Sequence, residues 1–171
     1  MEDLFSKVKS KRSPLERIMS YIPLYHGYKE KELRRESDRI LRVHIYQILS
    51  DAKQAIKKTQ IKLVKNKQTE IAKSMDELIT KCDTISQKIN RAEGGYSGFW
   101  DATKIKETDL ERLYQIDAAL ASTAEKVKQE VKVMIEKSSE QSFAINDDII
   151  QSIESFDEQM TSRTELLRGF S

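Results

Sequence analysis

The sequence predicts an all-α protein, either an antiparallel helical bundle or long helical hairpins with coiled-coil-like packing. Three observations lead to this prediction. Five glycines and two prolines in 171 residues are too few for a loop-rich fold or a β-sandwich. Residues 29–93 contain neither glycine nor proline. Apolar residues recur at helical spacing through most of the chain.

The first expected element is a short amphipathic segment over residues 1–24. Near its start, Leu4, Phe5 and Val8 share one helical face. Ser13 and Glu16 have the spacing of a capping box, with Pro14 at the first helical position between them. We therefore expect a short helix to begin after Ser13 and to end before the second proline.

Residues 25–137 are predicted to form the core of the bundle. The apolar stripe of residues 29–64 is out of phase with the heptad pattern of residues 68–93, and a polar stretch separates the two. This favours two helices joined by a tight turn, with one long helix containing a stutter as the alternative. After a loop rich in glycine and aromatic residues, Thr108 and Glu111 have the spacing of a second capping box, which predicts another long helix.

Residues 138–171 are predicted to form an acidic C-terminal helix. A polar stretch near 138–146 breaks the apolar stripe, which then resumes with looser spacing. This change of phase favours a helix that sits apart from the bundle or pairs with a partner. The alternative is that the helix packs on the bundle.

Charge is unevenly distributed, because residues 1–60 carry six more basic than acidic side chains and residues 107–171 carry seven more acidic ones. In one interpretation the basic half and the acidic half fold against each other, so that their electrostatic fields cancel. In the other, a basic face binds phosphates or anionic lipid. The candidates for such an anionic-surface site are Lys7, Lys9, Lys11, Arg12, Arg34, Arg35, Arg39 and Arg42.

We find no motif for catalysis, cofactor binding or metal binding. His26 and His44 lack the spacing of metal ligands, and Cys82 occupies an apolar heptad position typical of a buried side chain. We therefore expect a protein that is not an enzyme and has no cofactor or metal. Nucleic-acid binding is not expected either, because few aromatic residues cluster beside basic ones.

A second set of residues is a candidate for partner binding. The aromatic residues of the loop either pin a chain reversal against the end of the bundle or form a knob that binds a partner. Asp117 interrupts an apolar stripe, so we expect it to pair with an arginine of residues 34–42 or to mark a polar functional pocket. The candidate partner-binding residues are Tyr96, Phe99, Trp100, Asp101 and Asp117.

Two stretches resemble signatures of a family of small, all-helical, uncharacterised proteins of bacteria and archaea. The first is GYKEKELRRESDRILR, which begins at Gly27. The second is GYSGFWDA, which begins at Gly95 and is followed by LERLYQID, which ends at Asp117. The resemblance covers roughly residues 1–130 and implies no established activity. The resemblance implies that the aromatic loop and Asp117 belong to one structural junction or docking surface. It also implies that the protein is associated with stomatin/prohibitin-type (SPFH) membrane scaffold proteins.

The expected function is therefore that of a non-enzymatic helical adaptor or scaffold in the cytoplasm. Its partner would be another protein, such as an SPFH-type scaffold, and its apolar stripes would also allow oligomers. The alternative is a peripheral membrane protein that binds anionic lipid through its basic N-terminal part. A metal-binding or enzymatic bundle is the least favoured interpretation.

Overall fold

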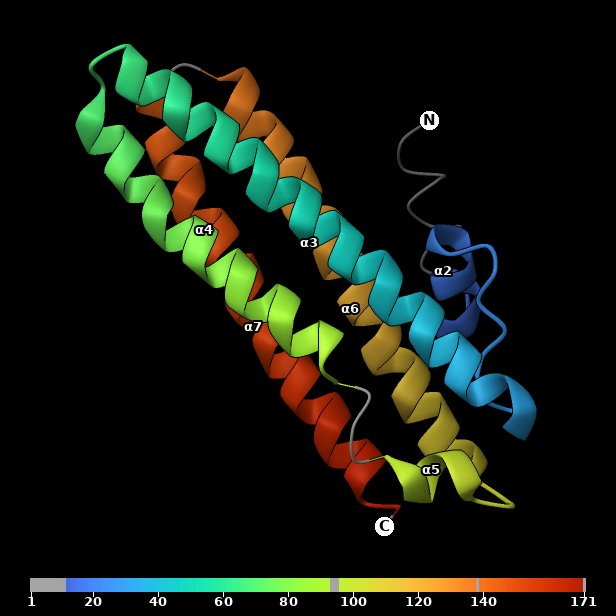
Figure 1. The fold of residues 1–171 in the computed structure, drawn as a ribbon. Coiled ribbons are helices and arrows are strands. Elements are labelled where there is room, and N and C mark those ends of the chain that lie inside the picture. Colours follow the sequence, from blue (N-terminus) through green and yellow to red (C-terminus); the bar gives the residue numbers. More distant parts are fainter. Residues whose placement is uncertain (1–11, 93–95, 138, 171) are drawn as a thin grey trace.

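The structure, a computed structural model, describes residues 12–92, 96–137 and 139–170. Within these ranges it contains helices and no strand, which confirms the all-α prediction. In the part of the chain that the structure describes, four long helices form the bundle, together with two short α-helices and one 3₁₀ helix (Figure 1). In chain order these are α2 (Pro14–Tyr21), η1 (Lys31–Leu33), α3 (Arg34–Lys65), α4 (Thr69–Asn90), α5 (Ser97–Asp101), α6 (Glu107–Glu136) and α7 (Ser139–Arg168).

The bundle consists of two antiparallel hairpins, α3 with α4 and α6 with α7, packed side by side (Figure 1). Between the hairpins, neighbouring helices run in the same direction. Asn146 in α7 donates a hydrogen bond to Ser74 in α4, and Lys88, further along α4, donates to Asp157, further along α7. Helices are therefore antiparallel within each hairpin and parallel between the two.

The turn between α3 and α4 confirms the prediction of two helices in residues 29–93. The backbone of Lys67 has a φ of 62°, in the left-handed region that commonly ends a helix. The N–H groups of Asn66 and Gln68 both donate to the carbonyl of Leu63, which satisfies this carbonyl at the end of α3. One continuous helix with a stutter is therefore excluded.

The two predicted capping boxes differ in outcome. The first is confirmed, because the Glu16 N–H donates to the Ser13 hydroxyl and the Ser13 N–H donates to the Glu16 carboxylate. The second is wrong. Helix α6 begins at Glu107 with Lys106 as its N-cap, so Thr108 already lies inside the first turn, and the N-cap residue makes no side-chain capping hydrogen bond.

Helix α7 packs in the bundle, against α4 and α6, and does not sit apart. Its looser stripe still faces the core, since Ile149, Ile153, Phe156, Met160 and Leu167 are buried. Helix α2 packs against α6, and Ile18 in α2 and Ile22 directly after it are buried. The apolar stripes of the described helices are thus buried within one chain, whereas Leu4, Phe5 and Val8 lie outside the described residues.

The first prediction concerns this core. Leu78 in α4 is fully buried, so Leu78→Ala removes apolar contacts and leaves a cavity. We expect the free energy of unfolding, measured by chemical denaturation, to fall by about 2–5 kcal/mol. Val133→Ala, at an exposed position of α6, is the control and should change it by less than about 0.5 kcal/mol. Equal effects of the two substitutions would contradict the packing described.

Candidate functional site

A buried polar cluster lies inside the bundle, and Arg163 of α7 is at its centre. The Arg163 side chain is 1% exposed. Its Nε donates to Asp117 Oδ1 of α6 at 2.7 Å, and its Nη2 forms an ion pair with Asp38 Oδ1 of α3 at 2.9 Å. Asp38 also accepts a hydrogen bond from Arg42 at 2.8 Å. Two arginines and two aspartates therefore balance one another in a region with almost no water access.

Two tyrosines complete the buried polar cluster. The Tyr28 hydroxyl donates to Asp117 Oδ2 at 2.6 Å and accepts from Arg163 Nη2 at 2.9 Å, and the Tyr25 hydroxyl also donates to Asp117 Oδ2, at 3.3 Å. Burial raises the pKa of both phenols, and the Asp117 carboxylate raises each pKa further. Both tyrosines thus stay neutral hydrogen-bond donors.

The electrostatic balance keeps Arg163 charged. Burial acts to lower the pKa of its guanidinium, but the Asp117 carboxylate, with Tyr28 and Asp38, outweighs this effect and holds the pKa above its ordinary value. Removing one member of such a group leaves an uncompensated buried charge, which is costly. The buried polar cluster therefore functions as a unit.

The buried polar cluster fixes the connection between α2 and α3, residues 22–30. Besides its hydroxyl bonds, Tyr28 donates its N–H to the Tyr114 hydroxyl at 2.8 Å, and its carbonyl accepts from Arg34 Nε at 2.9 Å. Gly27 has a φ of 79°, and a Cβ there would lie 2.6 Å from the Tyr114 hydroxyl oxygen. Only glycine fits this position without displacing Tyr114.

Arg34 extends the same arrangement to the aromatic loop. Its Nη1 donates to the carbonyls of Ala102 at 2.7 Å and Phe99 at 3.2 Å. Residues of the two stretches that carry the resemblance therefore lie close together in the structure. The first stretch contributes Tyr28, Arg34, Asp38 and Arg42, and the second contributes Phe99, Ala102, Tyr114 and Asp117. The two stretches form one structural junction.

The α2–α3 groove is the surface feature that this junction positions. It has a volume of about 370 Å³ and lies between residues 21–24 and the outer side of α3. Leu24 is 69% exposed and Val43 is 54% exposed at this groove. Burial lowers the pKa of His44, another lining residue, so this imidazole is neutral at pH 7. The complete lining is Tyr21, Ile22, Pro23, Leu24, Arg39, Ile40, Val43, His44 and Gln47.

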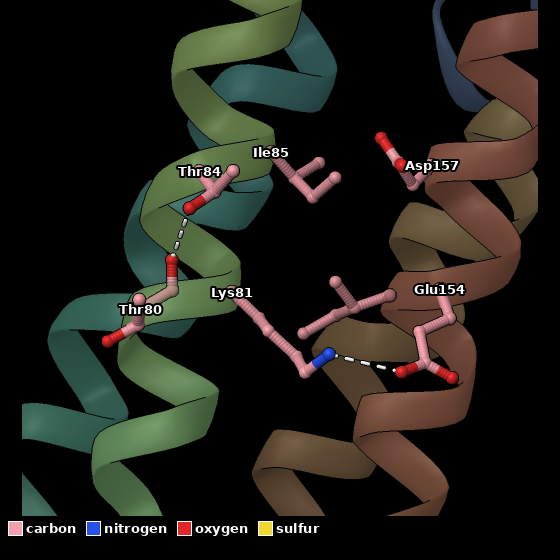
Figure 2. A pocket seen from close by; sticks show the side chains of 7 residues that line it. Thr80, Lys81, Thr84, Ile85, Glu154 and Asp157 are labelled. Atoms are coloured by element: carbon pink, nitrogen blue, oxygen red, sulfur yellow. Dashed lines mark hydrogen bonds and ion pairs between the residues drawn. The ribbon is translucent and has the colours of Figure 1, made fainter.

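A second groove, of about 200 Å³, lies between α4 and α7 and is shown in Figure 2. Lys81 of α4 donates to Glu154 of α7 at 3.1 Å across it (Figure 2). Further along, Lys88 pairs with Asp157. Polar side chains of this groove thus already bind one another. The α2–α3 groove, with its exposed apolar side chains, is the stronger candidate for binding a partner.

The structure corrects several predicted partner-binding residues. Tyr96, Phe99 and Trp100 are at most 4% exposed, so they do not form an exposed knob. They pin the chain reversal at the end of the bundle, as in the alternative interpretation, with Phe99 packed edge-on against Phe170. Asp101 is exposed and pairs with Arg35 at 3.5 Å.

Asp117 is buried, and its arginine partner is not the one predicted. The sequence placed that partner among residues 34–42, whereas the structure assigns it to Arg163, in the C-terminal helix. Asp38 of the predicted region binds the same guanidinium. The signal that could have revealed Arg163 is its position on the apolar stripe of α7, three residues after Met160 and four before Leu167.

The predicted anionic-surface residues do not form one surface. Arg34 and Arg42 are buried. Inside the fold, the guanidinium group of Arg34 donates to backbone carbonyls and that of Arg42 donates to Asp38. Arg12, Arg35 and Arg39 are exposed. Lys7, Lys9 and Lys11 lie outside the described residues.

Comparison with known proteins gives no relative, since no family model, no curated protein and no solved structure matches the chain. Among the residues placed in the structure, no group of three or more His, Cys, Asp or Glu side chains could hold a metal ion. No helix of the described ranges is both long and apolar enough to cross a membrane.

The second prediction concerns Arg163. Arg163→Met removes the cation shared by Asp38 and Asp117 and leaves their carboxylates buried with one compensating arginine fewer. We expect the free energy of unfolding to fall by about 3–5 kcal/mol in chemical denaturation. Arg112→Met, at an exposed position of α6, should change it by less than about 0.5 kcal/mol. A loss below about 1 kcal/mol for Arg163→Met would show that the buried polar cluster does not act as a unit.

The third prediction concerns Cys82, which is fully buried. Burial raises the pKa of its thiol to about 12, so only about one thiol in ten thousand is ionised at pH 8. The neutral thiol stabilises the fold below about pH 8.5, and this contribution is lost as the pH rises toward 12. We expect iodoacetamide to leave the native chain unmodified at pH 8 and to alkylate the denatured chain readily, as followed by mass spectrometry. Rapid labelling of the native chain would contradict this burial.

Proposed function

We propose that this protein is a non-enzymatic helical adaptor or scaffold that binds a partner protein in the α2–α3 groove. The observation that carries the proposal is the exposure of Leu24 and Val43 at one apolar groove. An exposed apolar patch with a polar rim is typical of a protein-binding surface. Here Arg39, Gln47 and His44 supply the polar groups beside the apolar ones.

The chemistry of the groove favours an amphipathic segment as its occupant. Apolar side chains of the partner would pack against Leu24, Ile40 and Val43. Polar groups of the same segment would meet Arg39, whose side chain is 60% exposed and already pairs with Glu36. Such helix-in-groove binding combines apolar anchors with a polar rim that fixes orientation.

Preorganisation supports the same proposal. Leu24 directly precedes Tyr25, whose hydroxyl binds Asp117 in the buried polar cluster, and the N–H of Tyr28 donates to the Tyr114 hydroxyl. The groove wall therefore needs little ordering when a partner binds, which lowers the entropic cost of association. The resemblance to a family associated with SPFH-type membrane scaffolds supports a scaffold role, with an SPFH-type protein as a proposed partner.

The fourth prediction tests this groove. A photo-crosslinking amino acid is placed at Leu24 in the full chain, expressed in the native cell, and the crosslinked protein is identified by mass spectrometry. We expect one dominant partner. Leu24→Asp with Val43→Asp should weaken its capture by purified chain at least about tenfold, because burying each aliphatic side chain contributes about 1.5–3 kcal/mol.

Val133→Asp, at an exposed aliphatic position outside the groove, is the matched control and should retain the partner. Both variants must keep the circular dichroism spectrum and unfolding midpoint of the unmodified chain. Equal capture by the folded Leu24→Asp/Val43→Asp variant would reject the groove as the binding site.

A further inference from the structure

Exposed aliphatic side chains gather at one end of the bundle. Seven large hydrophobic side chains are exposed in the described residues, and four of them are in the last turns of α3 and α6: Ile61, Val64, Val133 and Ile135. Because α3 and α6 run in the same direction, these turns lie at the same end, opposite α5 (Figure 1). The α2–α3 groove lies toward the other end of α3.

The same end of α3 is unusually basic. Residues 52–69 contain six lysines and no acidic residue. Lys57, Lys58, Ile61, Val64 and Lys65 are all exposed, and their spacing places them on one face of the helix, turned away from the core. We refer to these five residues as the lysine patch.

A simpler explanation accounts for only part of the lysine patch. Lysines near a helix C-terminus interact favourably with the helix dipole, which would explain Lys65. The dipole does not explain why Ile61 is 54% exposed and Val64 is 52% exposed between the lysines. An aliphatic pair flanked by cations on an exposed helix face is typical of a surface that meets the boundary between headgroups and acyl chains of a membrane.

We propose that the lysine patch binds the surface of an anionic phospholipid bilayer. Ile61 and Val64 would enter the headgroup boundary, and the three lysines would bind lipid phosphates. The cations are all lysines, which bind phosphate as point charges without the planar bidentate geometry of arginine. The lysine patch has no aromatic side chain on which nucleic-acid bases could stack. This surface is separate from the α2–α3 groove, so the inference goes beyond the proposed function.

The fifth prediction uses co-sedimentation of the full chain with vesicles. One set contains phosphatidylcholine alone, and the other contains phosphatidylcholine mixed with phosphatidylserine. We expect binding only to the second set, strongest at low ionic strength and weakened by added salt. Lys57→Gln/Lys58→Gln/Lys65→Gln should weaken it about fivefold for each lysine, or about a hundredfold in all.

Matched controls separate the lysine patch from net charge. Lys104→Gln/Lys106→Gln/Arg112→Gln removes three exposed cations at the opposite end of the bundle and should retain most of the binding. Ile61→Ser/Val64→Ser should weaken binding about tenfold, whereas Leu24→Ser/Val43→Ser should leave it unchanged. The latter pair also separates vesicle binding from partner capture in the α2–α3 groove.

Several results would overturn the proposal. One is the absence of binding to phosphatidylserine vesicles at low ionic strength. Another is equal weakening by the two triple variants, which would indicate a response to net charge only. A third is loss of binding in Lys7→Gln/Lys9→Gln/Lys11→Gln with full binding in the lysine-patch variant, which would assign the lipid contact to the N-terminal segment. Binding of RNA or of an acidic protein without vesicle binding would reject lipid as the occupant.

Discussion

The guanidinium group of Arg163 joins parts of the chain that are far apart in sequence. It binds Asp117 in α6, Asp38 in α3 and the hydroxyl of Tyr28 before α3. Adjacent residues of a helix differ by about 100° in direction, so a shift of α7 by one residue would turn Arg163 away from both carboxylates. Such a shift would also turn the apolar stripe of α7, whereas a shift by a whole heptad would keep the stripe facing the core and move Arg163 about 10 Å along the axis, away from both carboxylates. The buried polar cluster thus selects one register for the two hairpins.

The same interaction connects the core to the surface. Asp117 holds Tyr25 and Tyr28, and these residues hold the chain on either side of Gly27 against α6. Leu24 is presented at the α2–α3 groove by the residue next to Tyr25. The exposed apolar side chain therefore depends for its position on a fully buried carboxylate. The two stretches singled out in the sequence therefore depend on each other in the structure, since one supplies Tyr28 and Asp38 and the other supplies Asp117.

Local sequence patterns predicted the helices well. They predicted contacts between residues far apart in the sequence poorly. The heptad positions Met75, Leu78 and Cys82 are buried, because spacing along one helix is sufficient to define its apolar face. The partner of Asp117 could not be derived in this way, since pairing of α6 with α7 is a tertiary property and several arginines were available. Composition likewise could not distinguish an exposed aromatic loop from one folded onto the end of the bundle. The lysine patch was missed because charge was counted along the chain and not around each helix.

The arrangement of two hairpins has a consequence for how the chain folds. Contacts within each hairpin join residues close in sequence, as between Lys53 and Asp83, whereas Tyr28 and Arg163 are separated by 135 residues. Closing a long loop costs more entropy than closing a short one, so the hairpins gain their contacts at lower cost than the contacts between them. The contacts between α3 and α4 therefore do not depend on Arg163, which lies in α7. Before α7 docks, Asp38 and Asp117 lack their shared cation, so we expect the two hairpins to reach their final register only together with α7.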